Sequence, residues 1–146
     1  MKKWMFIIVA MLAFNVVAWA DKDKPIKVSE IPKAALVFIE THFPGKSIAI
    51  AKVDKDFKEK NYEVIFTNGD EVEFDKKGKW TKVECKQDQV PEAVIPEAIQ
   101  KYVSQHYPNT KIVKIELADH KGYEVDLDNG LEIEFDKKMH VRDIDR

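Results

Sequence analysis

The stretch YEVIFTNGDEVEFDKK, residues 62–77, decides the fold of this chain. Polar and apolar residues alternate on both sides of Asn68-Gly69, a dipeptide typical of the tight turn in a β-hairpin. The stretch YEVDLDNGLEIEFDKK, residues 123–138, repeats the pattern with its own Asn-Gly turn. The sequence therefore predicts two copies of one hairpin-bearing unit.

A helix-like pattern precedes each hairpin. Apolar residues with helical spacing follow Ile31-Pro32 and Ile95-Pro96, and both runs end at a His-aromatic-Pro sequence, residues 42–44 and 106–108. Proline is tolerated in the first turn of a helix, and the residue before a proline disfavours the helical conformation. We expect one amphipathic helix at the start of each copy.

Two further runs complete the predicted unit. Residues 48–53 and 79–85 supply a first and a fourth strand, so each copy reads as a helix followed by a four-stranded antiparallel meander in an α+β fold. The copies differ in length in a charged stretch, residues 54–61 against 118–122, which we interpret as a loop. A unit of this size has a marginal core alone, so the copies are expected to share a sheet or an interface.

The first 20 residues have the organisation of a secretory signal peptide. Lys2 and Lys3 precede an apolar run, and Ala18-Trp19-Ala20 fits the small-x-small cleavage rule. The run is shorter than the ~20 residues that a membrane-spanning helix needs. The predicted organisation is a signal peptide at 1–20, a first copy at 21–86 and a second copy at 87–146. The protein is thus expected in the periplasm or outside the cell, with no stable membrane anchor after cleavage.

Composition narrows the function classes. A chain of 146 residues with a formal charge of −2 has no basic excess, so we expect no nucleic-acid partner. Cys85 is the only cysteine and cannot form an internal disulfide. A half-buried place on a strand is its favoured role, with pairing between chains or metal binding as alternatives.

Alternation divides the strand residues into a helix-side set and an open face that the helices leave uncovered. An exposed aromatic residue among apolar neighbours, rimmed by charge, is typical of a protein-binding patch. The alternative is a solvated face whose charges maintain solubility. Trp80 favours binding to an envelope protein or peptide of unknown identity. The predicted partner-binding residues are Trp80, Ile48, Ile50, Ile65, Glu63 and Glu73.

The second copy places a row of carboxylates on the same face. Asp126, Asp128 and Glu132 are candidate oxygen ligands for Ca²⁺, although they lack the spacing of an EF-hand loop. A wet acidic face without an ion is the other interpretation.

No catalytic constellation is predicted. His42 and His106 fall at matching helix ends, where an imidazole complements the helix dipole, and neither has a nucleophile nearby in the sequence. We therefore expect a protein that is not an enzyme, with no catalytic residues and no cofactor.

The repeated Ile-Pro, His-aromatic-Pro, Tyr-Glu-Val, Asn-Gly and Glu-x-Glu-Phe-Asp elements, with Gly78-Lys79-Trp80, resemble the PepSY-like family of exported Bacteroides-type proteins. That family is also labelled β-lactamase-inhibitor-like. The resemblance implies an extended antiparallel sheet with helices on one side, in a periplasmic protein that is not an enzyme. The inhibitor label implies that a hydrolase such as a peptidase could bind the open face, as an analogy of fold alone. The second copy has Met139-His140-Val141 where the first has Gly78-Lys79-Trp80, so a role for the tryptophan is not duplicated.

Overall fold

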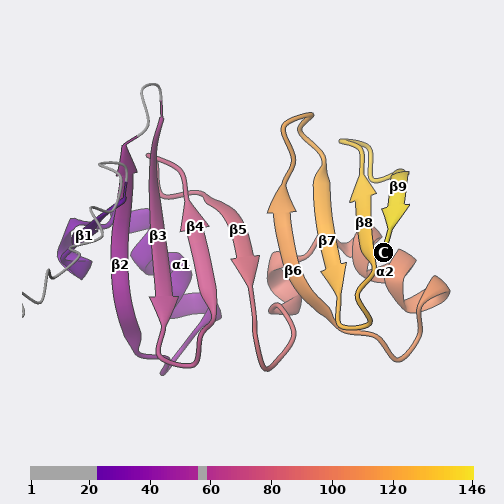
Figure 1. Ribbon diagram of the computed structural model, residues 1–146, viewed down its shortest axis with the longest axis horizontal. Coiled ribbons are helices and arrows are strands. Elements are labelled where there is room, and N and C mark those ends of the chain that lie inside the picture. Colours follow the sequence, from indigo (N-terminus) through magenta and orange to yellow (C-terminus); the bar gives the residue numbers. More distant parts are fainter. Residues whose placement is uncertain (1–22, 56–58) are drawn as a thin grey trace, which may run out of the picture.

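The computed structural model describes residues 23–55 and 59–146 of the chain. Within these ranges the strands form one antiparallel sheet whose spatial order follows the sequence (Figure 1). The predicted α+β class with an antiparallel sheet is confirmed, whereas the predicted signal peptide, residues 1–20, lies outside the described residues. The elements in chain order are β1 (Asp23–Ile26), the 3₁₀ helix η1 (Val28–Glu30), α1 (Lys33–His42), β2 (Ile48–Lys55), β3 (Lys60–Phe66), β4 (Glu71–Phe74), β5 (Trp80–Glu84), the 3₁₀ helix η2 (Glu92–Val94), α2 (Glu97–His106), β6 (Ile112–Leu117), β7 (Tyr123–Leu127), β8 (Glu132–Phe135) and β9 (Val141–Asp145).

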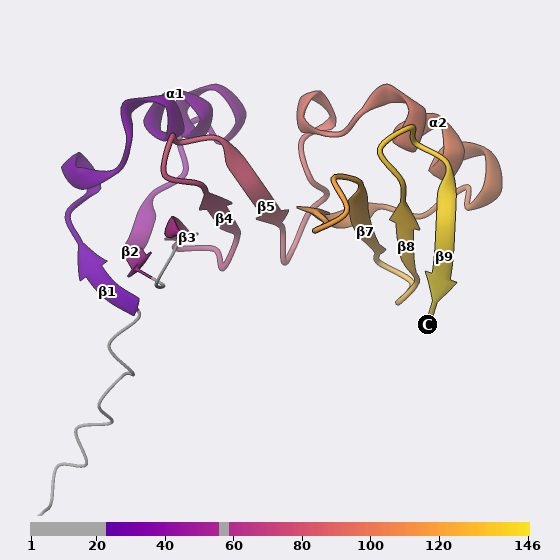
Figure 2. The ribbon, with the colours of Figure 1, turned by 90° about the horizontal axis from the view of Figure 1, so that it is seen from above.

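Both α-helices lie on the same side of the sheet (Figure 2). Pro32 and Pro96 are the N-cap residues, where the missing amide hydrogen costs no helical hydrogen bond. At the other end, the Phe43 amide donates to the Ile39 carbonyl and closes the last turn of α1. None of the described helices is long and apolar enough to cross a membrane.

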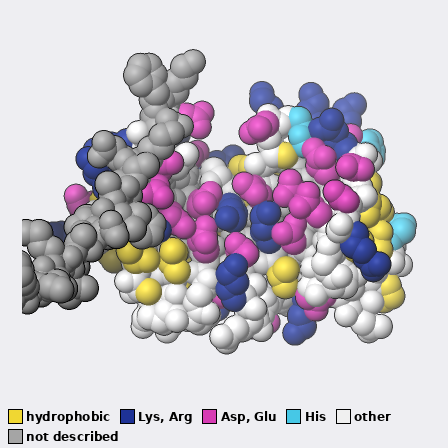
Figure 3. All heavy atoms as spheres, in the orientation of Figure 1, with side chains coloured by type: hydrophobic (Ala, Val, Ile, Leu, Met, Phe, Trp, Pro, Cys, Tyr) yellow, Lys and Arg dark blue, Asp and Glu magenta, His cyan; other side chains and the backbone are white. Residues whose placement is uncertain are grey.

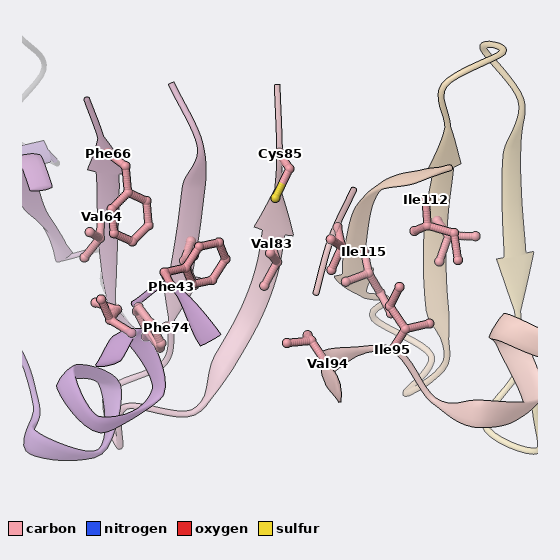
Figure 4. Packing of buried hydrophobic residues seen from close by; sticks show 14 of the residues in the cluster. Phe43, Val64, Phe66, Phe74, Val83, Cys85, Val94, Ile95, Ile112 and Ile115 are labelled. Atoms are coloured by element: carbon pink, nitrogen blue, oxygen red, sulfur yellow. The ribbon is translucent and has the colours of Figure 1, made fainter. Parts of the chain in front are cut away.

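The hydrophobic core fills the space between the helices and the sheet (Figure 4). Phe43 of the α1 C-cap stacks on Phe66 of β3 with ring centroids 5.1 Å apart. The two halves of the sheet meet where Val83 of β5 pairs with Ile115 of β6, and both side chains are fully buried. This strand pairing joins β1–β5 and β6–β9 into one continuous sheet.

Two features of the fold differ from the sequence expectations. β1 is an additional strand that pairs with β2 and was not predicted, because Asp23-Lys24-Pro25-Ile26 shows no strand-like alternation. The stretch 54–61, predicted as a loop, is partly strand, since Asp54 pairs with Asn61 and Lys55 with Lys60. Both strands therefore extend further than their apolar alternation indicates.

The predicted position of Ile48 on the open face is wrong. The β2–β3 register shifts between Ile48 and Ile50, so Ile48 lies opposite the buried Phe66 and packs against the core. Ile50 lies opposite Ile65 and keeps the predicted face. A β-bulge of this kind inserts one residue and reverses the side-chain alternation beyond it.

Trp80 is likewise on the helix side, and its predicted exposure on the open face is wrong. The β4–β5 register shifts after Glu73, which brings Trp80 opposite the fully buried Phe74. The half-buried indole packs against the core, with its ring centroid 6.4 Å from that of Tyr123 in β7. Trp80 thus contributes to the contact between the two halves of the molecule.

Candidate functional site

The open sheet face is the side away from the two helices, and charged side chains dominate it. Figure 3 views this side and shows acidic groups across its middle with lysines among them. The acids face outward because they alternate along β3, β4, β7 and β8 with buried residues such as Val64, Val72, Val125 and Ile133. The pleat of each strand therefore builds this surface directly from the sequence alternation.

The first charged cluster surrounds Lys82 of β5. Its Nζ lies 3.2 Å from Glu71 Oε1 and 3.8 Å from a carboxylate oxygen of Glu73, and Glu84 is a third partner at 3.8 Å. Nearby, Lys52 Nζ of β2 lies 3.5 Å from Glu63 Oε2 of β3. One carboxylate oxygen from each of Glu63, Glu71 and Glu73 falls within 4.8 Å of the others. Three carboxylates are thus held together by cross-strand lysines.

The crowding changes the proton affinities of this cluster. Partial burial, reinforced by the negative charge of Glu71, raises the pKa of Glu63 above its ordinary value. Partial burial also raises the pKa of Glu73, with further contributions from Glu71 and Glu63 that the Lys82 ammonium opposes. The acidic excess is therefore only partly neutralised within the cluster.

The second charged cluster surrounds Lys114 of β6 in the same way. Lys114 Nζ lies 3.3 Å from Glu124 Oε1, 3.5 Å from Asp126 Oδ2 and 3.5 Å from Glu116 Oε2. Burial lowers the pKa of Lys114, but the surrounding carboxylates outweigh burial and raise it well above its ordinary value. The ammonium is therefore a fixed positive centre in this acidic surface.

Glu124, Asp126 and Glu132 form the acidic triad of the second half. One carboxylate oxygen from each lies within 4.8 Å of the others, and Asp126 Oδ1 is buried without a hydrogen-bond partner among the described residues. Burial and the charges of Glu124 and Asp126 raise the pKa of Glu132. Asp126 and Glu132, two of the predicted metal ligands, are thus brought together.

Asp128, the third predicted metal ligand, is not part of this triad. Its Oδ1 accepts a hydrogen bond from the Lys111 amide at 3.0 Å, so its side chain ties the β7 end to the preceding loop. Glu124 takes its place because it lies beside Asp126 on the open face. Alternation along β7 could have found Glu124, since it lies two residues before Asp126 and therefore on the same face of the sheet.

A small apolar area borders the acidic surface on the β1 side. Ile50 and Ile65 face each other across β2 and β3 and are half-buried. A hollow of about 380 Å³ is lined by Asp23, Pro25, Ile50 and Lys52. Of the predicted apolar anchors, Ile50 and Ile65 therefore remain on the open face.

The cysteine and the two helix-end histidines singled out in the sequence are packed against other parts of the protein. Cys85 is buried, and burial raises the pKa of its thiol to about 12. His42 and His106 each pack against an aromatic ring one helical turn earlier, Phe38 and Tyr102, with centroids 4.5 and 4.1 Å apart. These imidazoles contact neighbouring helix residues, and His106 Nδ1 is paired with the Tyr102 carbonyl.

The fold and this face together define an α+β protein with a single antiparallel sheet and an exposed acidic surface. The chain belongs to the PepSY-like family, described as "Putative beta-lactamase-inhibitor-like, PepSY-like", which matches residues 60–143. The family resemblance predicted from the sequence motifs is confirmed. A search of the curated proteins found no match.

Solved structures of Bacteroides proteins are similar to nearly the whole described chain. A Bacteroides vulgatus protein, described as a "putative periplasmic protein from DUF2874 family", is 55% identical with a TM-score of 0.83, covering 87% of this chain and 99% of its own. A Bacteroides thetaiotaomicron protein, titled "putative calcium-regulated periplasmic protein", is 54% identical with a TM-score of 0.81, covering 85% and 97%. A second Bacteroides vulgatus protein, described as a "putative periplasmic protein of unknown function", is 39% identical with a TM-score of 0.79, covering 85% of this chain and 99% of its own.

Proposed function

We propose that the protein is a non-catalytic periplasmic binding module that engages a protein or peptide through its open sheet face. The observation that supports this proposal most is that the helices cover only one side of the sheet. The other side presents an acid-rich surface beside Ile50 and Ile65. Ion-paired side chains on adjacent strands are already fixed, so a partner orders few of them on binding. Periplasmic location is supported by the similar Bacteroides proteins, which are described as putative periplasmic proteins, and by the predicted signal peptide.

The partner-binding residues of this proposal are Ile50, Ile65, Glu63 and Glu73. Trp80 and Ile48 leave the set because both lie on the helix side. The acidic surplus favours a partner surface that carries lysine or arginine next to an apolar group. Inhibition of a peptidase or another hydrolase is the narrower form of the proposal, and the family description supports it only as an analogy of fold.

Site-specific photo-crosslinking in the living cell tests this proposal. A photoreactive amino acid at Ile65 is expected to give discrete adducts with a partner, whereas the same group at Val37 of α1 gives none. Val37 is a suitable control because it is 52% exposed on the helix side. Adducts from Val37 alone, or from neither position, would contradict a partner on the open face.

The proposal includes two copies of one unit, at residues 21–86 and 87–146. The matching registers support this division: Phe74 pairs with Trp80 after a bulge in β4–β5, and Phe135 pairs with Val141 after a bulge in β8–β9. Expression of residues 87–146 alone tests whether the second copy folds by itself. We expect it to be marginal, because Ile115 loses its buried partner Val83.

A second candidate function is calcium binding at Glu124, Asp126 and Glu132. Three clustered carboxylates are hard oxygen ligands suited to Ca²⁺, with water completing the usual six to eight positions. The buried Asp126 Oδ1 lacks a hydrogen-bond partner among the described residues and is a further candidate ligand atom, while Oδ2 of the same carboxylate lies 3.5 Å from Lys114 Nζ. The 54% identical Bacteroides thetaiotaomicron protein is titled as calcium-regulated, which supports the same ion here.

Calorimetry and thermal melting with CaCl₂ at millimolar concentration test the calcium proposal, with MgCl₂ as the comparison ion. We expect saturable heat and a higher melting temperature for the wild type, and loss of both in Glu124→Gln and Glu132→Gln. Asp128→Asn is the matched control, because an asparagine Oδ1 can keep the hydrogen bond from the Lys111 amide. Equal responses in all variants would show that the triad is not the site.

A further inference from the structure

The outer edge of β9 is the most informative surface that the open-face proposal does not use. Within the part of the chain that the structure describes, β9 is the last strand of the sheet and pairs with β8 alone. It pairs with β8 in the same register as β5 pairs with β4: Val141, Asp143, Ile144 and Asp145 correspond to Trp80, Lys82, Val83 and Glu84. β9 is therefore the positional counterpart of β5.

The outer edge of β5 is occupied by a strand of this same chain. There, Lys82 lies opposite Glu116 and Glu84 opposite Lys114, on either side of the buried Val83–Ile115 pair. The strand that pairs with β5 thus places an apolar residue opposite Val83. On either side of it, each charged residue of β5 faces a residue of the opposite charge. Cross-strand pairs of this kind stabilise a sheet, and like charges placed opposite each other destabilise it.

β9 presents the same arrangement with nothing beside it in the described chain. Ile144 is 41% exposed, whereas Val83 at the corresponding position of β5 is fully buried. Both flanking positions are acidic: Asp145 lies opposite Glu132 of β8, and Asp143 lies opposite Glu134, which is ion-paired with Arg142 at 3.3 Å. On its outer side, β9 therefore has no neighbouring strand in the described chain to cover Ile144 with an apolar residue or to place cations opposite Asp143 and Asp145.

We propose that the outer edge of β9 accepts an extended segment of a partner protein with a basic–apolar–basic sequence, which adds a tenth strand to the nine in the described sheet. The apolar residue covers Ile144, and the two cations pair with Asp143 and Asp145. The backbone groups of the two strands form the ladder that β6 forms with β5. The binding element is a strand edge and not the open face, so this inference extends the proposed function.

A second copy of this chain does not fit the edge. An antiparallel β9–β9 pair centred on Ile144 would place Asp143 of one copy opposite Asp145 of the other, which is unfavourable at both ends. Pairing of β9 with β1 of another copy would use an edge that contains Pro25, which has no amide hydrogen for a ladder. Charge and backbone chemistry both favour a different, basic partner.

A designed peptide pair tests the proposal on the purified protein. The probe is a fluorescein-labelled heptapeptide in which lysine alternates with valine, and its comparison peptide has glutamate in place of every lysine. We expect saturable anisotropy for the lysine peptide and at least tenfold weaker binding of the glutamate peptide. Hydrogen exchange of residues 141–145 should slow when the lysine peptide is bound, because their edge amides become paired.

Two controls separate strand pairing from general charge attraction. Asp143→Lys with Asp145→Lys should reduce lysine-peptide affinity at least tenfold and reverse the preference between the two peptides. Asp23→Lys with Glu40→Lys makes the same change in net charge at exposed positions outside β9 and should leave the affinity within twofold. A lysine peptide whose edge-facing amides are N-methylated should bind at least tenfold more weakly.

Three results would overturn the inference. Equal binding of the N-methylated peptide would show attraction without strand pairing, and equal loss in the Asp23→Lys, Glu40→Lys variant would show a non-specific charge effect. A dimer that the Asp143→Lys, Asp145→Lys variant dissociates would identify a second copy as the occupant. The open-face proposal uses Ile65 and Val37 as its probes, so the two proposals can fail separately.

Discussion

Lys114 Nζ lies 3.5 Å from Asp126 Oδ2, and the lysine side chain is only 17% exposed. The ammonium therefore neutralises the same carboxylates that form the proposed calcium site. Replacement by glutamine leaves Glu116, Glu124 and Asp126 facing each other without their shared cation. We expect Lys114→Gln to lower the free energy of unfolding by about 1–2 kcal/mol at neutral pH.

The same variant should respond more strongly to Ca²⁺ than the wild type, because a competing cation has been removed. The pKa of Lys114 is raised in the folded protein, so its contribution to stability is present at neutral pH and is lost only at strongly alkaline pH. Melting curves with and without CaCl₂ measure both effects. A Lys114→Gln protein as stable as the wild type would show that the cluster does not depend on its central cation.

Asp70 is a buried acid whose carboxylate links three separate parts of the first half of the chain by hydrogen bonds. Its Oδ2 accepts hydrogen bonds from Lys46 Nζ at 2.8 Å and Asn68 Nδ2 at 3.0 Å, and its Oδ1 accepts one from the Lys86 amide at 3.0 Å. Asp70→Ala removes the shared acceptor of all three donors next to the core. We expect a loss of about 2–3 kcal/mol in the free energy of unfolding, measured by urea denaturation with Glu40→Gln as the surface control.

The contribution of Asp70 should also depend on pH. Burial raises its pKa, but hydrogen bonds from Lys46, Lys86 and Asn68 outweigh burial and lower it below the ordinary value. Stability from this group is present above the unfolded-state pKa of about 3.9 and is lost as the pH falls through the lower folded-state pKa. The difference in stability between wild type and Asp70→Ala should therefore shrink below about pH 4. A difference that stays constant down to pH 2 would contradict this.

Trp80 shows which parts of this fold the sequence alternation predicts and which it does not. Alternation around the Asn-Gly turns correctly placed Val64, Val72 and Val125 in the core, because those strands pair without interruption. The bulges beside Ile48 and Trp80 each add one residue to one strand. Neither bulge changes the apolar pattern of its own strand in a recognisable way, so Ile48 and Trp80 were assigned to the wrong face.

The candidate site was predictable to a similar degree. The acids of β3, β4, β7 and β8 alternate with core residues, so their common face follows from period two alone. The lysines that organise them come from β2, β5 and β6, and their positions depend on how strands distant in sequence pair. The alignment of β5 with β6, which places Glu84 opposite Lys114, has no signal in either strand.

Replacing Trp80 by alanine should now affect stability first. The half-buried indole packs against the core and lies near Tyr123 of the second half. Truncation removes this contact, and we expect a loss of about 2–3 kcal/mol, below the range for a fully buried tryptophan. Val141→Ala at the corresponding position of β9 is a smaller change and should cost less. Trp80→Ala with unchanged stability would be inconsistent with helix-side packing.

Gly78 approaches the start of α1 too closely for any side chain. A Cβ at this position would lie 2.8 Å from the Ala35 amide nitrogen and 2.9 Å from Pro32 Cβ, and the backbone φ is +82°. Gly78→Ala should therefore destabilise the protein by about 2 kcal/mol or more, through the strained backbone and the contact with α1. Gly130→Ala is the matched comparison, since its φ is +87° with no atom within 4 Å. Equal losses in the two variants would assign the whole effect to backbone conformation.

Cys85 should be chemically inert in the folded protein. The side chain is 3% exposed, and burial raises the thiol pKa to about 12, so little thiolate forms at neutral pH. We expect no alkylation by iodoacetamide within an hour at pH 7.5 and full alkylation in 6 M guanidinium chloride, both measured by mass spectrometry. Asp70→Ala provides an internal test, because it loosens the Lys86 segment next to Cys85 and should speed alkylation through local opening. Rapid labelling of the native wild type would instead favour the alternative in which this cysteine pairs with another chain.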